Sequence, residues 1–309
     1  MQKSVFHNMV QYSVWPNCCN ACQFCLRLNR DIWGKQAMIK RIHDIRKNIT
    51  VVDWQDTFSD GISLLGGELY FIQDKEIQDE FMLLIDDIIE KILKTSPNPN
   101  VKFSTVTNGL YNPTFLFRVL DRIAKEVGTH HMDINFSYDI KYRYASEEKR
   151  LQCIENINKV HDRYNYIVGV QTITTQYFIE KVLSGEFDIK KFEEEVIPGS
   201  ELHLLYPHPI NPLLPPLPDF QFKRVSLIKF LMYLKNNLQR HYQNFYWSTY
   251  NSGIFKFTGM SDCDGENIQQ PELSDGKEQI NPKCGHSMLY KCYSDSDKCL
   301  LCDLLTVGL

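Results

Sequence analysis

The chain has 309 residues, 43% hydrophobic and 23% charged, with a formal net charge of −4, a composition that suits one large α/β domain or a domain with an appendage. The weak negative charge argues against long nucleic acid as a partner, because surfaces that bind it usually carry a basic patch. With no run of 18 apolar residues, and no secretory-signal pattern in residues 1–10, we expect no membrane partner and a cytoplasmic location.

Short apolar runs alternate along the chain with longer amphipathic segments, a pattern typical of β/α units. The predicted strands are residues 5–14, 62–65, 101–107, 132–137, 167–172 and 202–205. The predicted helices are residues 74–94 with Asp74 as N-cap, a helix with Pro113 in its first turn that ends at Gly128, and a helix after Ser146 with Leu151, Ile154 and Ile157 on one face. Six such units by about residue 210 predict an α/β fold, a parallel and open barrel smaller than the eight-unit TIM form.

The chain changes in character beyond that point. Six of the thirteen prolines fall within residues 207–218, which predicts a stiff linker or a loop over the barrel mouth. A helix at about residues 223–240 leads into a cysteine-rich tail. We therefore predict two domains, residues 1–210 and residues 211–309.

Three cysteines, Cys18, Cys22 and Cys25, follow the first predicted strand at the spacing C-x3-C-x2-C. Iron–sulfur clusters are normally held by four thiolates, so a loop with three predicts a [4Fe–4S] cluster with one iron open to a small molecule. Cys19 offers an alternative C-x2-C-x2-C reading, but the ferredoxin pattern then requires Cys-Pro where this chain has Asn29 and Arg30. A zinc site would favour a second C-x2-C knuckle nearby, which is absent from the sequence around the loop.

The segment Cys-Cys-Asn-Ala-Cys-Gln-Phe-Cys of residues 18–25 resembles the cluster loop of the radical S-adenosylmethionine (radical SAM) superfamily. The resemblance covers about two-thirds of the chain and implies a partial (β/α)6 TIM-like barrel. It also implies S-adenosyl-L-methionine as cofactor, cleaved reductively to methionine and a 5′-deoxyadenosyl radical that takes a hydrogen atom from the substrate. The cofactor and cluster would carry the hard chemistry, and the protein would supply orientation and exclude water.

The same resemblance assigns cofactor contacts to the ends of the predicted strands, where α/β enzymes gather their chemistry. The glycine-rich motif Gly66-Gly67-Glu68 would bind the amino group of the methionine moiety, and a tight turn with a solvated Glu is the alternative. The other candidates are Phe24, Thr107, Asn108, Ser137, Asp139 and Gln171. The alternatives are a core role for Phe24, a turn at Asn108 and a strand cap at Gln171. Lys141 or Arg143 would pair with the cofactor's carboxylate.

The tail contains five more cysteines, with His286 among them: Cys263, Cys284, Cys292, Cys299 and Cys302. The C-x2-C pair at residues 299–302 has the spacing of a metal knuckle, and a metal would support a segment with few apolar residues. A second [4Fe–4S] cluster, structural zinc and plain buried thiols are the three interpretations. The number of cysteines is too small for the two clusters of a SPASM-type extension.

A peptide or protein is the first candidate substrate, because tails with auxiliary clusters are common in peptide-modifying members of the superfamily that the chain resembles. A nucleotide, a tRNA base or a small metabolite is the alternative, and the reaction subclass, oxidoreductase or transferase, stays open. The resemblance also implies a one-electron reductant such as flavodoxin or ferredoxin. A hypothesis of another class is a non-catalytic protein with closed structural iron–sulfur or zinc sites.

Overall fold

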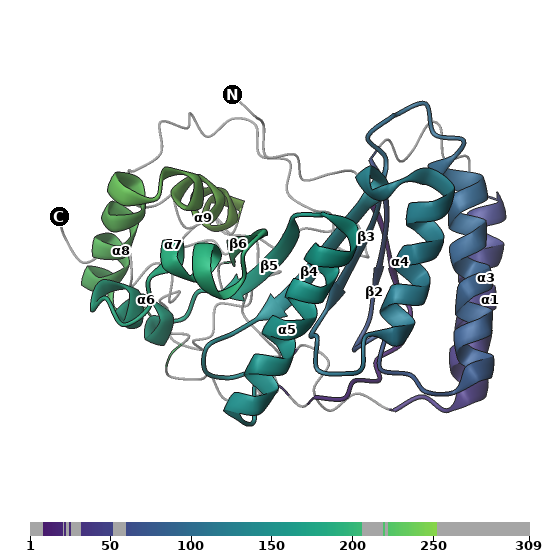
Figure 1. Ribbon diagram of the computed structural model, residues 1–309, viewed down its shortest axis with the longest axis horizontal. Helices are drawn as coiled ribbons and strands as arrows, with labels where there is room; N and C mark the ends of the chain where they lie inside the picture. Colours follow the sequence, from purple (N-terminus) through teal and green to yellow (C-terminus); the bar gives the residue numbers. More distant parts are fainter. Residues whose placement is uncertain are drawn as a thin grey trace, which may run out of the picture. The chain divides into compact units, whose positions relative to one another are not determined.

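The computed structural model describes residues 9–20, 22, 25, 32–51, 60–205, 219 and 222–251 (Figure 1). Six strands lie in chain order across one parallel sheet: β1 (Met9–Ser13), β2 (Gly61–Leu65), β3 (Lys102–Thr107), β4 (Met132–Tyr138), β5 (Val168–Ile173) and β6 (Ser200–Leu205). Among these described strands, β1 and β6 form the two edges, so the sheet is open. The predicted parallel α/β architecture is confirmed, with strand ends that differ from prediction by a few residues.

Helices connect the strands. They are α1 (Lys35–Val51), α3 (Lys75–Ile88), α4 (Thr114–Val127), α5 (Glu147–Tyr164), α6 (Gln176–Leu183), α7 (Ile189–Lys191), α8 (Arg224–Asn237) and α9 (Gln239–Asn251). Short π-helical turns at Ile89–Leu93 and Phe192–Val196 extend α3 and α7, and a 3-10 turn at Thr129–His131 precedes β4. None of the helices described here is long and apolar enough to cross a membrane.

The described residues form two compact units. The first comprises those within residues 1–23, 27–171 and 190–202, and the second those within residues 24–26, 172–189 and 203–309. In the second unit, Phe230 packs edge-to-face against Phe178 and Phe245, with ring centroids 6.2 and 5.7 Å away. The predicted domain boundary near residue 210 lies outside the described residues and stays a prediction.

Helix ends follow the capping residues seen in the sequence. The Asp74 carboxylate accepts hydrogen bonds from the backbone N–H groups of Glu76 and Ile77 at 3.0 and 3.2 Å, which confirms it as the N-cap of α3. Ser146 caps α5 in the same way, and α4 ends at Gly128, whose φ of 94° favours glycine.

The predicted inward face of α5 is partly wrong. Leu151 is 53% exposed, whereas Ile154 and Ile157 are buried as predicted. The buried stripe also includes Cys153 and Val160. Leu151 precedes Cys153 by two residues and therefore points about 200° away from it around the helix.

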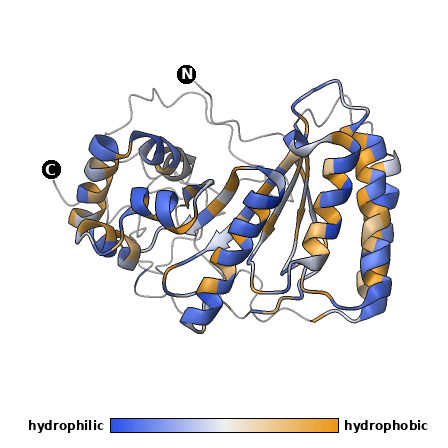
Figure 2. Cartoon of the chain, in the orientation of Figure 1, coloured by the Kyte–Doolittle hydropathy of each residue, from blue (hydrophilic) through white to orange (hydrophobic). Residues whose placement is uncertain are grey.

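Helices α3, α4 and α5 lie beside the sheet (Figure 1), and apolar side chains of these helices and of the strands are buried. On the helix-facing side of the sheet, five strand residues are in register and fully buried: Ile62, Leu64, Phe103, Ile134 and Phe136. Phe81 of α3 packs against Trp15, Tyr70 and Phe115, with ring centroids 5.6 to 6.3 Å apart. Figure 2 shows the mixed hydropathy along α1, α3 and α4 that is typical of helices with one buried side.

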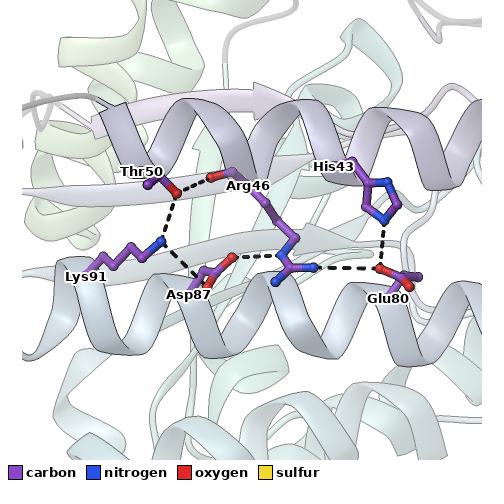
Figure 3. Close-up of polar contacts among 6 residues, drawn as sticks. All are labelled: His43, Arg46, Thr50, Glu80, Asp87 and Lys91. Carbon is purple, nitrogen blue, oxygen red and sulfur yellow. Dashed lines mark hydrogen bonds and ion pairs between the residues drawn. The ribbon is translucent and has the colours of Figure 1, made fainter.

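A polar network joins α1 to α3 and its π-helical extension (Figure 3). Arg46 lies at its centre, with Nε 2.7 Å from an Asp87 oxygen and Nη1 3.7 Å from Glu80. Three further residues extend the network along the two helices: His43, Thr50 and Lys91. The Arg46, Glu80 and Asp87 side chains are 29%, 27% and 21% exposed, so water screens these ion pairs only in part.

Candidate functional site

The segment between β1 and α1, residues 18–32, carries the three candidate cluster cysteines and is named the cysteine loop below. Two hydrogen bonds join Asn17 and Trp33, the residues that flank this loop. The Asn17 side chain donates to the Trp33 carbonyl at 2.9 Å and accepts from the Trp33 N–H at 3.0 Å. Asn17 is 8% exposed, so this pair fixes the base of the loop. The sequence gives no signal for this role of Asn17.

The turn Gly66-Gly67-Glu68 follows β2 and packs against the chain that enters the cysteine loop. Gly67 N–H donates to the Trp15 carbonyl at 2.8 Å, and Glu68 N–H donates to the Asn17 carbonyl at 2.7 Å. A Cβ at Gly67 would lie 2.1 Å from the Asn17 carbonyl oxygen, so only glycine fits there. The glycine therefore has a role in positioning the loop, whatever it contributes to a ligand.

The Glu68 side chain is completely buried and joins the ends of β2 and β3. One carboxylate oxygen accepts from the Thr107 hydroxyl at 2.9 Å and from the Tyr70 N–H at 3.2 Å, and the other accepts from the Asn108 N–H at 2.6 Å. Burial raises the pKa of the Glu68 carboxyl from 4.5 to about 7, against the opposing effect of these donors. The predicted contact of Glu68 with an ammonium group stays a prediction.

Asn108, at the end of β3, links this buried network to the cysteines. Its side-chain Nδ2 lies 3.6 Å from Cys18 Sγ and 3.5 Å from Cys19 Sγ, while its Oδ1 accepts from the Leu110 N–H at 2.9 Å. Thr107, its neighbour, is buried and hydrogen-bonded to the Tyr111 hydroxyl at 2.6 Å. The predicted residues Glu68, Thr107 and Asn108 are thus brought together beside the cysteine loop.

The loop cysteines are surrounded by N–H donors. Asn20 places its backbone nitrogen 3.4 Å from Cys18 Sγ and its Nδ2 3.2 Å from Cys22 Sγ. Arg143 Nη1 lies 3.8 Å from Cys22 Sγ. Hydrogen bonding between the adjacent side chains raises the pKa of Cys18 and lowers that of Cys19. Thiols with N–H donors aimed at sulfur, as at Cys18 and Cys22, match the surroundings of iron–sulfur ligands.

Cys18, Cys22 and Cys25 stay predicted ligands, and their exposure differs. Cys18 is exposed, Cys22 is buried and Cys25 is partly exposed. Within the described residues, no cluster of three or more His, Cys, Asp or Glu side chains is close enough to hold a metal ion. The donor set fits a thiolate-bound cluster in its chemistry.

The connection after β4 reaches the cysteine loop. Asp139 is 2% exposed, and one carboxylate oxygen accepts from the backbone N–H of Lys141 at 2.8 Å and from that of Tyr142. Burial raises the pKa of the Asp139 carboxyl. The turn that it stabilises brings Arg143 to the loop, where the Arg143 carbonyl accepts from Asn20 Nδ2 at 2.7 Å.

The structure says less about the roles of the remaining predicted site residues. Ser137 on β4 and Gln171 on β5 are both partly exposed. Phe24 and all five tail cysteines, Cys263, Cys284, Cys292, Cys299 and Cys302, lie outside the described residues, so their roles stay predictions.

Comparisons with known proteins give a limited result. No protein-family model matches the chain, and no curated protein matches it either. Solved structures that match include native anSMEcpe with bound AdoMet, at 14% sequence identity and a TM-score of 0.48, over 84% of this chain and 69% of that one. This level of likeness assigns neither a family nor a function to this chain.

Proposed function

We propose that the chain is a radical SAM enzyme, which cleaves S-adenosyl-L-methionine reductively and uses the resulting radical to take a hydrogen atom from a substrate. The observation that carries the proposal is the cysteine loop itself. Cys18, Cys22 and Cys25 stand at C-x3-C-x2-C directly after β1. The turns after β2 and β3 meet the loop at the carboxyl ends of the parallel strands, where α/β folds bind their ligands.

Cys18, Cys22 and Cys25 would hold three irons of a [4Fe–4S] cluster, which leaves one iron for the amino and carboxylate groups of the cofactor. The chemistry that such a cluster supplies when bound is one-electron reduction of the sulfonium. The protein's own contribution is positional: Asn20, Asn108 and Arg143 direct N–H donors at the ligand sulfurs. Such hydrogen bonds raise the reduction potential of a bound cluster.

The predicted cofactor contacts divide into two kinds in this proposal. Glu68 and Asp139 are buried and already accept hydrogen bonds from the protein, so they act by fixing the turns around the cofactor. Ser137 and Gln171 are partly exposed and are the better candidates for direct polar contact. Gly66 and Gly67 let the backbone approach closely.

The finer assignments belong to the same proposal. The substrate is a peptide or protein, or else a small metabolite or nucleotide, and the electron comes from a flavodoxin- or ferredoxin-like reductant. The cysteine-rich tail carries a second [4Fe–4S] cluster or zinc. Each rests on sequence pattern.

The test is cofactor cleavage by the anaerobically purified full chain. With dithionite and S-adenosyl-L-methionine, the wild type should form 5′-deoxyadenosine, measured by liquid chromatography and mass spectrometry. Cys18→Ala, Cys22→Ala and Cys25→Ala should each abolish it, whereas Cys153→Ala, which alters a buried core thiol, serves as the matched control. A colourless wild-type protein with zinc and no cleavage would replace the proposal by a structural metal protein.

A further inference from the structure

The face of the sheet opposite the helices carries a row of polar side chains. Strand register places Gln11 beside Ser63, Ser63 beside Ser104, and Ser104 beside Asp133, one residue from each of β1 to β4. Neighbouring strands lie about 4.8 Å apart, so the row is continuous. We name these four residues the polar row.

The polar row faces away from the helices because side chains alternate along a strand. The residues on either side of it in sequence, such as Ile62 and Phe103, point into the buried helix-facing core. Strands of parallel sheets are normally apolar on both faces. A row of serine, glutamine and aspartate is therefore a departure that packing alone does not require.

The hydrogen bonds around Asp133 leave more acceptor sites than donors unused. Ser104 Oγ donates to one carboxylate oxygen at 2.7 Å, and Asn135 Nδ2 donates to the other at 3.0 Å. An ionised carboxylate only accepts and has about four acceptor sites, so two remain. The Ser104 oxygen and the Asn135 carbonyl oxygen can also accept further bonds, and the Asn135 amide nitrogen keeps one N–H that can donate. The three groups together match a ligand that brings several N–H donors.

The charge of this site is also unbalanced. Asp133 is partly exposed, and within the described part of the chain no Lys, Arg or His lies within ion-pair distance of it. Ser63 is 4% exposed and adds a hydroxyl group to the polar row beside Ser104.

We propose that the polar row, with Asn135, binds an amine or guanidinium group of the substrate. Asp133 provides the opposite charge, while Ser104 and Asn135 accept the remaining N–H bonds. Ser137, at the carboxyl end of the same strand, lies four residues farther on, about 13 Å away at 3.3 Å per residue. The cationic group therefore serves to bind the substrate, and it is distant from the carbon that reacts beside the cysteine loop. This role in the reaction rests on the proposed function above.

Binding of simple cations tests the proposal without any turnover. The probes are n-butylguanidine and n-butylamine, with n-butanol as the uncharged probe and butyrate as the anionic one, titrated into the full chain by ligand-observed NMR. Both cations should bind at least tenfold more tightly than butanol and butyrate. Asp133→Asn should weaken cation binding at least tenfold, whereas Asp162→Asn, which alters an exposed carboxylate on α5, should leave it unchanged.

A second variant covers the event that Asp133→Asn fails to fold. Ser63→Val removes a hydroxyl of the polar row, keeps strand propensity, and narrows the space beside Ser104; it should also weaken cation binding at least tenfold. Equal binding of all four probes, or unchanged cation binding in a folded Asp133→Asn or Ser63→Val variant, would overturn the proposal.

Two further probes distinguish a peptide substrate from a small-molecule substrate as the molecule that carries the cationic group. A peptide substrate predicts that N-acetyl-arginine N-methylamide binds more tightly than agmatine, and a small-molecule substrate predicts the reverse order; in both cases Asp133→Asn must weaken the tighter probe. Because these titrations contain no S-adenosyl-L-methionine, their failure leaves 5′-deoxyadenosine formation untouched. Failure of cofactor cleavage likewise leaves the cation site intact.

Discussion

The buried Glu68 carboxyl should make the stability of the protein fall as pH rises. Its pKa in the folded chain is about 7, raised by burial from an ordinary value of 4.5. The folded state thus holds the proton more tightly than the unfolded chain, and the stabilisation is complete below pH 4.5 and lost as pH rises to about 7. At about 1.4 kcal/mol per tenfold change in proton affinity, the loss is about 3 kcal/mol.

Glu68→Gln removes this titration and also a backbone contact. If the Gln oxygen accepts from the Asn108 N–H, its amide nitrogen can donate to Thr107, but the Tyr70 N–H then loses its acceptor. A buried donor left without a partner costs about 1–3 kcal/mol. We expect Glu68→Gln to be less stable than the wild type at pH 5 by that amount, and the gap to close by about pH 7.5 because only the wild type loses stability.

Urea unfolding followed by tryptophan fluorescence, under anaerobic conditions at steps from pH 4.5 to 8, measures both effects. The difference between the wild-type and Glu68→Gln curves isolates this residue from all other titrating groups. Glu148→Gln, an exposed carboxyl at the start of α5, is the matched control and should give a flat difference. A wild-type minus Glu68→Gln difference that is flat, or that grows as pH rises, would refute the reasoning.

Three further substitutions test other parts of the structure. Phe81→Ala should lower the free energy of unfolding by about 3–5 kcal/mol in urea titrations, because it empties a buried aromatic cluster; a loss below 1 kcal/mol would show that this packing is wrong. Arg46→Ala should cost about 1–3 kcal/mol by the same method, since it removes partly buried ion pairs with Asp87 and Glu80; no measurable loss would contradict these contacts. Asn108→Ala should lower the midpoint potential of the bound cluster in a redox titration while iron content is retained, because an N–H donor to sulfur is lost; an unchanged potential would contradict that contact.

The sheet and three of its helices were predictable because their signals are local. Apolar runs mark the strands, and Asp74 and Ser146 cap helices through their own side chains. Helix α1 was not predicted, although Met38, Ile42 and Ile49 lie on one buried face of it. Its many charged residues obscure the helical spacing of its apolar residues.

The site was predictable in its residue types and not in its contacts. The cysteine spacing and Gly66-Gly67-Glu68 are readable motifs, but the burial of Glu68 and its bond to the Asn108 N–H depend on the meeting of two strand ends. The hydrogen-bonded pair Asn17 and Trp33 joins residues 16 positions apart in the sequence, and no sequence motif predicts it. The polar row does have a signal, since Ser63, Ser104 and Asp133 alternate with apolar residues in three strands. That signal shows the face only once strand register is known.

The most direct test of the central claim asks whether one iron of the cluster is open to the cofactor. The measurement is electron–nuclear double resonance on the reduced full chain with S-adenosyl-L-methionine labelled with ¹⁵N at its amino group. We predict a hyperfine coupling between that nitrogen and the cluster in the wild type and in Cys153→Ala, and its loss in Cys18→Ala. A reduced cluster that shows no coupling to the labelled nitrogen, or a chain that assembles no cluster at Cys18, Cys22 and Cys25, would contradict the proposed function.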